Sequence, residues 1–308
     1  MEDGSQPHGE PEGTDAPRGV FGGHLIARLP AVRPERASDA WFYEQPVAMA
    51  MLGDLMLGRA NRDDATLEAA HARVELERFA AAGGRVVVEL TAPDEGRDVA
   101  MLKALAAETG VRIVGAAAVS ADGAQRAVDD VSRGDAGLLL VRADDESLTG
   151  SEGTVIASAT CPVVIRGAGA ELVGAARRAQ DAGVDPARIA VTNAVSLVRE
   201  PEQLAALMQL GVFAVFDGLG RIPSVRTVVS DHEVAVAIAG LVGAGHGDQV
   251  LLGTGLDRKH AFTSFGGHGL RFVPAQFVPY LGMFGLGDQA RRFVTANLHR
   301  FLEGETRA

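Results

Sequence analysis

Polar or charged residues follow most of the short apolar runs in this sequence. They are His24, Glu89, Arg142, Arg166, Asn193, Asp217 and Asp257. Histidine and carboxylate side chains exchange protons, arginine binds anions, and asparagine can donate a hydrogen bond to an oxyanion. If the runs are parallel strands whose carboxyl ends meet, these groups gather at one site. The set then suits acid–base chemistry on a small anionic molecule.

The runs themselves have the pattern of strands that are buried on both faces, because apolar residues occupy successive positions instead of alternate ones. The runs are Val20–Ile26, Arg85–Leu90, Arg112–Ala117, Ala136–Val141, Pro162–Ile165, Arg188–Val191, Val212–Phe216 and Gln249–Leu252. Eight such runs separated by helical patterns predict a (β/α)8 barrel, an α/β fold of the TIM type, with its functional mouth at the carboxyl ends of the strands.

Helical patterns separate the runs, and several of them stop at glycine. Asp64–Ala82 ends before Gly83-Gly84, and Asp98–Thr109 ends before Gly110. Only Ala124–Ser132 and Thr149–Thr160 remain for the helices after the third and fourth strands. That flank of the barrel should be thinly covered, so we expect a dimer or higher homo-oligomer to cover it.

The composition indicates one globular domain in a chain of 308 residues, 47% of them hydrophobic. Residues 1–19 are polar and rich in glycine and proline, which predicts a disordered leader before a single barrel domain over residues 20–308. The net charge of −11 disfavours nucleic acid as a partner. No apolar run predicts a membrane span. A single cysteine, Cys161, excludes an intramolecular disulfide, and we expect a cytoplasmic protein.

Three segments resemble the phosphotriesterase-like branch of the amidohydrolase superfamily. Ala81–Ala116 resembles its second strand–helix unit, Ser230–Gly255 its seventh helix and eighth strand, and Phe265–Leu302 its C-terminal helices. The Gly-Arg-Asp triplet at Gly96–Asp98 and the asparagine at Asn297 are the more specific features. The resemblance implies the same barrel and a hydrolase in which two divalent metals share a bridging hydroxide.

The resemblance also locates the positions of the metal ligands, which in the family are four histidines, a carbamylated lysine and an aspartate. In this sequence they fall on Gly22, His24, Leu140, Arg166, Asn193 and Gly255, with Asp257 two residues beyond the last. A leucine supplies no ligand and an arginine repels a dication. We therefore expect neither the binuclear centre nor another cofactor. A single divalent metal on His24 and Asp257 is the weaker alternative.

Each candidate residue also has a purely structural interpretation. Arg166 needs an anion, which is either Glu89 or Asp217 in an internal ion pair or a bound ligand. His24 is a general acid or base, a former metal ligand, or a hydrogen-bonded barrel histidine. Asp217 is a general base or a loop cap, and Glu89 is a further candidate for proton transfer. Asn193 donates to an oxyanion or to the loop backbone.

A second group of residues is assigned to substrate binding alone. Trp41 and Tyr43 follow the first strand and predict either an aromatic wall or lid packing. His268 lies in a Gly-Gly-His-Gly turn, and Asp257 begins a charged cluster after the eighth strand. Asp231-His232-Glu233 looks like a metal motif but is better interpreted as part of a capping box with Ser230 at the N-cap.

Three functional hypotheses remain open. The first is an enzyme that works without the two metals on a small anionic metabolite, by hydrolysis, elimination, cyclisation or isomerisation. The second is a catalytically inactive relative that binds a ligand or a partner. The third is a mononuclear metal-dependent hydrolase of ester, lactone or phosphoester bonds. A deep pocket with convergent titratable groups favours an enzyme, whereas a plugged mouth favours a binding protein.

Overall fold

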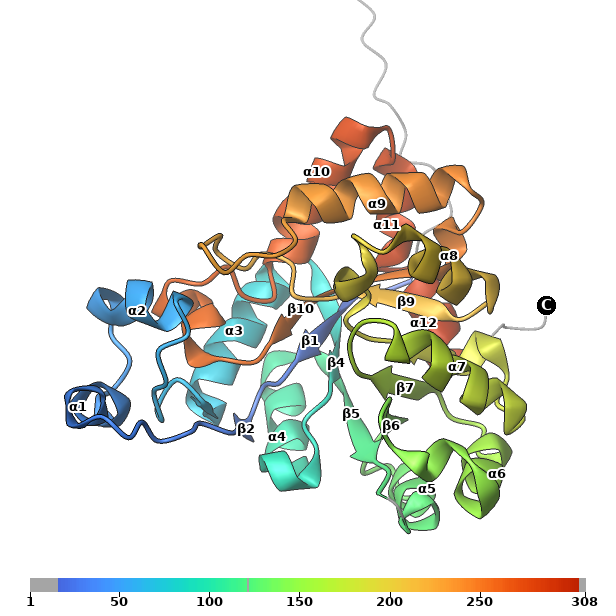
Figure 1. Cartoon of the computed structure of the whole chain (residues 1–308), viewed down its shortest axis with the longest axis horizontal. Helices are drawn as coiled ribbons and strands as arrows, with labels where there is room; N and C mark the ends of the chain where they lie inside the picture. The colour runs from blue at the N-terminus through green and yellow to red at the C-terminus, as the bar shows by residue number, and fades with distance from the viewer. Residues whose placement is uncertain (1–15, 121, 305–308) are drawn as a thin grey trace, which may run out of the picture.

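The structure is a computed structural model that describes residues 16–120 and 122–304. Eight parallel strands close into a barrel in the order β1-β10-β9-β8-β7-β6-β5-β4, as predicted (Figure 1). The strands are β1 (Arg18–Gly23), β4 (Gly84–Glu89), β5 (Arg112–Ala118), β6 (Leu138–Arg142), β7 (Val163–Arg166), β8 (Ile189–Val191), β9 (Phe213–Phe216) and β10 (Val250–Leu256). Their carboxyl ends therefore form one mouth.

Helices surround the barrel. They are α3 (Ala69–Ala81), α4 (Val99–Thr109), α5 (Ala124–Ser132), α6 (Gly150–Ser158), α7 (Glu171–Asp181), α8 (Pro201–Gln209), α9 (Asp231–Gly243), α10 (Val278–Leu281), α11 (Gly287–Phe293) and α12 (Ala296–Glu303). Those from α3 to α9 connect successive strands, and the last three follow β10. The two helices expected to be short, α5 and α6, have nine residues each. The capping box predicted at Ser230 and Glu233 begins α9.

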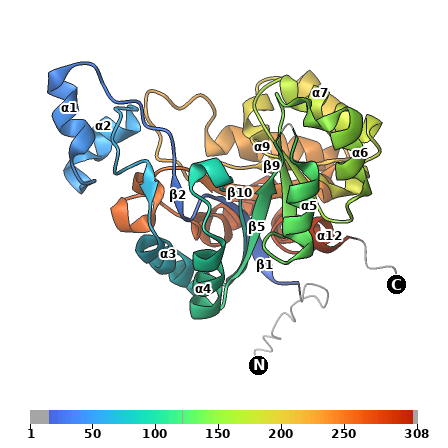
Figure 2. The ribbon, with the colours of Figure 1, turned by 90° about the horizontal axis from the view of Figure 1, so that it is seen from below.

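The long connection from β1 to α3 forms a lobe beside the barrel. It holds α1 (Ala37–Glu44), α2 (Leu52–Met56) and an antiparallel pair of short strands, β2 (Ala27–Arg28) and β3 (Thr66–Leu67). Figures 1 and 2 both show α1 and α2 projecting away from the strands. The helix predicted from Asp64 begins later, at Ala69, because Thr66 and Leu67 pair as a strand with β2.

The core has two layers separated by the barrel wall. The inner layer includes Phe21, Val88, Leu140 and Val164, and the outer layer lies between the strands and the helices. Phe301 of α12 contacts Phe21 and Phe213 with ring centroids 5.9 and 5.6 Å apart. Because α12 fills the amino-terminal end of the barrel, the opposite end is left for function.

The amino-terminal segment enters the barrel earlier than the sequence predicts. β1 begins at Arg18, and the Gly19 amide donates to the Val294 carbonyl at 2.7 Å. Residues 1–15 of the expected leader lie outside the described residues. Among the residues that the structure does describe, none of the helices is long and apolar enough to cross a membrane.

Candidate functional site at the barrel mouth

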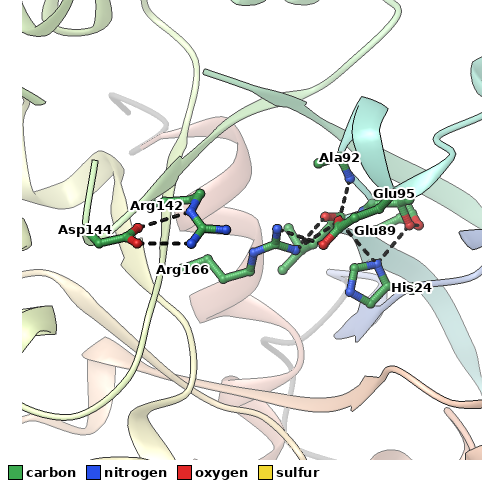
Figure 3. A network of polar contacts seen from close by, with 9 residues as sticks. His24, Glu89, Ala92, Glu95, Arg142, Asp144 and Arg166 are labelled. Atoms are coloured by element: carbon green, nitrogen blue, oxygen red, sulfur yellow. Dashed lines mark hydrogen bonds and ion pairs between the residues drawn. The ribbon is translucent and has the colours of Figure 1, made fainter. Parts of the chain in front are cut away.

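An ion pair between Arg166 and Glu95 lies in the mouth. Arg166 ends β7, and its Nη1 and Nη2 donate to Glu95 Oε2 and Oε1 at 3.2 and 3.0 Å (Figure 3). Nη1 also lies 3.4 Å from the Leu90 carbonyl. Glu95 closes a short 3-10 turn (Pro93–Glu95) and accepts the Ala92 amide at 2.8 Å. The pair is fixed on both sides, and its side chains are 26% and 17% exposed.

His24 belongs to a second chain of contacts, which runs to Glu89 through Thr91. His24 Nδ1 lies 3.0 Å from Thr91 Oγ1, and the Thr91 hydroxyl donates to Glu89 Oε1 (Figure 3 shows His24 and Glu89). Glu89 also accepts the Leu25 and Thr91 amides, each at 3.2 Å. When Glu89 is ionised, the Thr91 proton goes to Glu89, so Thr91 Oγ1 accepts from His24 Nδ1–H and the histidine Nε2 keeps its lone pair.

Burial shifts the pKa values of both ends of this chain of contacts. Desolvation raises the pKa of the Glu89 carboxyl to about 7, against the opposing effect of its hydrogen bonds. Desolvation also lowers the pKa of His24, an effect that Glu95 opposes and Arg166 reinforces. The imidazole is therefore neutral at neutral pH. Glu89 is fully buried and lies on the opposite face of β4 from the inward-facing Val88 and Leu90, so it acts on the mouth only through Thr91.

Asn193 and Asp217 form a neighbouring pair at the ends of β8 and β9. The Asn193 amide donates to Asp217 Oδ1 at 2.7 Å, and the Asn193 side chain donates to the Gly167 carbonyl at 3.1 Å. Asn193 has a left-handed backbone with φ of 58°. Burial raises the pKa of Asp217 to about 6, and Asp257 adds to the increase. Asp217 is thus partly protonated near neutral pH, which suits a proton donor.

Arginines occupy the rim of the mouth. Asp257 follows β10, and its Oδ2 accepts from Arg221 Nη2 at 3.1 Å. Arg142 ends β6 and donates from Nε and Nη2 to Asp144 at 3.1 and 3.0 Å. The structure therefore places all seven polar residues that follow the apolar runs at the carboxyl ends of their strands.

Three residues assigned to substrate binding have other contacts. Trp41 is 67% exposed on α1, in the lobe, and the Tyr43 hydroxyl donates to the Ala31 carbonyl at 3.1 Å. Their helix lies at the edge of the molecule in Figures 1 and 2, so neither residue meets the other candidates. His268 Nδ1 donates to the Gly220 carbonyl at 2.7 Å, which ties its loop to the loop after β9.

Comparison with known proteins identifies the family of the chain. The model of the phosphotriesterase family matches residues 57–302, most of the chain. The chain belongs to the phosphotriesterase family. This finding confirms the family resemblance that the sequence shows.

Individual relatives and solved structures share only a low sequence identity with this chain. N-acetyltaurine hydrolase of Rattus norvegicus is 27% identical over 255 residues, which cover 70% of this chain and 72% of the relative. The resiniferatoxin-binding protein from Rhodobacter sphaeroides superimposes with a TM-score of 0.81 at 26% identity, covering 95% of this chain and 93% of that one. The lactonase Lmo2620 from Listeria monocytogenes has a TM-score of 0.73 at 18% identity, with coverage of 95% and 96%, and shows the fold alone.

The residues of this phosphotriesterase-family member do not fit a binuclear metal centre. Leu140 is buried in the apolar inner layer, and the Arg166 guanidinium is already bound to Glu95. Gly255 has a left-handed φ of 55°, and a Cβ added there would lie 3.0 Å from the Gly218 amide nitrogen. An aspartate at position 255 would therefore be strained. A cation at Arg166 and an apolar side chain at Leu140 leave too few donors for two metals.

The alternative of one metal on His24 and Asp257 has little more support. Asp257 is paired with Arg221, and the Nδ1 of His24 is used by Thr91. Within residues 16–120 and 122–304, no group of three or more His, Cys, Asp or Glu side chains has an arrangement that could hold a metal ion. The donor set at the mouth consists of an imidazole, carboxylates and guanidinium groups, which can exchange protons and bind anions.

Two residues of the site, Glu95 and Thr91, are missing from the set predicted from sequence. Both lie in the loop after β4, between Glu89 and the Gly-Arg-Asp triplet. The triplet itself has structural roles. Arg97 donates to Asp130, and Asp98 caps α4 by accepting the Met101 amide. Glu95 accepts the amide of Ala92, three residues earlier, but alanine has no side chain that could complete a capping box, so the sequence carries no signal for this carboxylate.

A cavity of about 560 Å³ lies beside the same loop. It is lined by residues 26–28, 66–69 and 96–99, and its lining does not include His24, Glu95 or Arg166.

Proposed function

We propose that this protein is a metal-independent hydrolase that cleaves an acyl bond in a small anionic molecule, with His24 as the general base. The observation that carries the proposal is the hydrogen-bonded chain from Glu89 through Thr91 to His24 Nδ1. With Glu89 ionised, this chain of contacts holds the imidazole proton on Nδ1 and leaves Nε2 free to take a proton from water. The lowered pKa of His24 keeps that nitrogen unprotonated at neutral pH.

The other residues of the mouth supply the remaining steps. Water attacks the acyl carbon as its proton passes to His24 Nε2, and the acyl oxygen becomes an oxyanion. The second Asn193 Nδ2 hydrogen, which the Gly167 carbonyl leaves free, is assigned to that oxyanion. Asp217, whose pKa burial raises to about 6, gives a proton to the leaving nitrogen or oxygen. The N–H groups of Arg166 that Glu95 does not use bind the negative charge of the substrate.

The relatives support the choice of an acyl bond and an anion. N-acetyltaurine hydrolase acts, by its name, on an N-acetyl compound of an aminosulfonate, and it is 27% identical to this chain. N-acyl aminosulfonates and N-acyl amino acids are therefore the first substrates to test. The mechanism proposed for this chain uses its own side chains, because the metal-ligand positions other than His24 hold glycine, leucine, arginine and asparagine, which are not ligands of zinc-type sites.

A second candidate function is ligand binding without turnover. The specific observation in its favour is that the Glu95 carboxylate already accepts from two nitrogen atoms of Arg166, so a protein side chain stands where the negative group of a substrate would otherwise bind. The resiniferatoxin-binding protein, at 26% identity, shares the fold and is named for binding. In that case an anionic ligand binds at the mouth and is recovered unchanged.

The experiment measures release of acetate or amine from N-acetyltaurine and a panel of N-acyl amino acids by chelator-treated protein. His24→Gln should lower kcat by about 10²–10⁴-fold, the usual contribution of a general base. His299→Gln is the control, because His299 is 41% exposed and paired with Glu303 on α12, at the opposite end of the barrel. Equal rates for the two variants refute His24 as base, and binding without product favours the second candidate.

A further inference from the structure

Two arginines stand side by side on neighbouring strands of the mouth. Arg142 and Arg166 are register partners in the parallel pair β6–β7. Side chains at paired positions of neighbouring strands point to the same face of a sheet. In Figure 3 the Arg142 guanidinium lies between Asp144 and Arg166. Like charges placed directly opposite on one face destabilise a sheet, so the pairing has a cost that a function would explain.

Each guanidinium is anchored at one edge by its own carboxylate. Asp144 accepts from Nε and Nη2 of Arg142 at 3.1 and 3.0 Å, and Glu95 accepts from both Nη atoms of Arg166. Across residues 16–120 and 122–304, Arg142 Nη1 and Arg166 Nε have no hydrogen-bond acceptor. The side chains are 63% and 26% exposed. Four carboxylate contacts thus fix the two cations and leave donors of both open to a ligand.

We propose that Arg142 and Arg166 together bind the tetrahedral oxyanion headgroup of the substrate, of the sulfonate type. The proposal rests on the proposed function in taking the mouth as the substrate site, and it adds Arg142 as the residue that sets specificity. A carboxylate has two oxygens, which one guanidinium fork can occupy completely. A tetrahedral headgroup has three, so it can bridge two forks.

The charges around Arg142 favour a singly charged headgroup. Asp94 and Asp145 lie near its guanidinium, in addition to Asp144. These carboxylates repel a dianion more strongly than a monoanion. A sulfonate, which carries one charge at neutral pH, should therefore bind better than a phosphonate that is partly doubly charged.

The test is a calorimetric titration of the full-length protein with methanesulfonate, methylphosphonate and acetate, none of which can be hydrolysed. Wild type should bind methanesulfonate more tightly than either of the others. Arg142→Gln should weaken methanesulfonate binding about tenfold or more, and Arg142→Lys nearly as much, because an ammonium lacks the fork. Arg112→Gln is the matched control, since Arg112 is 54% exposed, paired with Glu303, and begins β5 at the far end of the barrel.

Melting temperatures of all variants accompany the titrations. The Arg142 side chain is exposed, so Arg142→Gln should fold normally, and a loss of binding in that variant is then not a loss of the fold. Unchanged methanesulfonate binding in Arg142→Gln overturns the proposal, as does acetate binding as tight as that of methanesulfonate, or no binding of any probe to wild type. Because no probe is turned over, these outcomes are independent of whether the protein hydrolyses an acyl bond.

Discussion

Glu95 holds Arg166 through both carboxylate oxygens, at 3.2 and 3.0 Å, at the position where the phosphotriesterase family places a metal-binding histidine. The guanidinium places a permanent positive charge at the centre of the mouth. The Glu95 carboxylate neutralises this charge but leaves other N–H groups of the guanidinium available to a ligand. In the function proposed above, this guanidinium binds an anion at a position where the family uses a metal.

The first prediction concerns the stability of this pair. Glu95→Gln keeps an acceptor for the Ala92 amide but leaves the Arg166 charge without its partner. We expect the free energy of unfolding at pH 7 to fall by about 1–3 kcal/mol, because the pair is mostly shielded from water. Asp144→Asn, which breaks the exposed pair with Arg142, should lower the free energy of unfolding less than Glu95→Gln does, because water screens that pair. Urea unfolding of both variants tests the prediction, and equal losses would contradict it.

A second prediction follows from the raised pKa of Glu89, which burial brings to about 7. The folded protein keeps this proton over a pH range in which the unfolded chain, with an ordinary carboxyl, releases it. The contribution of Glu89 to stability therefore falls as pH rises from about 4.5 to 7. Glu89→Gln lacks this titration, so relative to wild type it should gain about 2–3 kcal/mol between pH 5 and pH 8.

Denaturant unfolding at pH 5, 6, 7 and 8 measures this difference. Asp217 and His24 titrate in both proteins, so their effects cancel to first order in the comparison. A difference between wild type and Glu89→Gln that does not change with pH would show that Glu89 titrates normally.

The third prediction concerns Thr91 as the positioning residue for His24. Thr91→Val removes the hydroxyl that accepts from Nδ1, whereas Thr91→Ser keeps it. We expect Thr91→Val to lower kcat about tenfold or more with little change in KM, and Thr91→Ser to remain close to wild type. At a pH above the Glu89 pKa of about 7, nitrogen NMR of the imidazole should show the proton on Nδ1 in wild type and a mixture of tautomers in Thr91→Val. An unchanged tautomer in that variant would remove Thr91 from the mechanism.

The sequence predicts the barrel well because its strands are short runs of successive apolar residues, a pattern that buried parallel strands require. The same pattern locates Arg166, Asn193 and Asp217, each at or directly after the end of a run. It does not predict the partner of Arg166. That partner is Glu95, neither Glu89 nor Asp217, because a 3-10 turn after β4 carries the carboxylate back over the mouth.

The roles of Glu89 and of the aromatic residues were harder to predict for related reasons. Alternation along β4 places Glu89 on the outer face, away from the mouth, and a polar residue at a strand end does not by itself reveal its face. Trp41 and Tyr43 follow β1 in sequence, but the intervening lobe carries them to the edge of the molecule. The paths of loops depend on tertiary contacts that hydrophobic periodicity does not encode.

A fourth prediction is that the protein forms a dimer or higher oligomer through its thinly covered flank. A cavity of about 200 Å³ lies next to this flank, lined in part by Leu102 and Ala106 of α4, Val114 of β5 and residues 134–137 before β6. Light scattering on a sizing column should show more than one chain per particle, and Ala106→Glu should shift the population towards monomer because it places a charge in this cavity. A wild-type monomer at high concentration would contradict the prediction.

The most direct test of the central claim is to compare kcat/KM for N-acyl aminosulfonates between chelator-treated protein and protein supplied with zinc or manganese, with metal content measured on the same samples. A metal-independent site predicts less than one metal per chain, equal kcat/KM within about twofold, and a loss of about 10²-fold or more in His24→Gln under both conditions. Activity that appears only with stoichiometric metal would contradict this account.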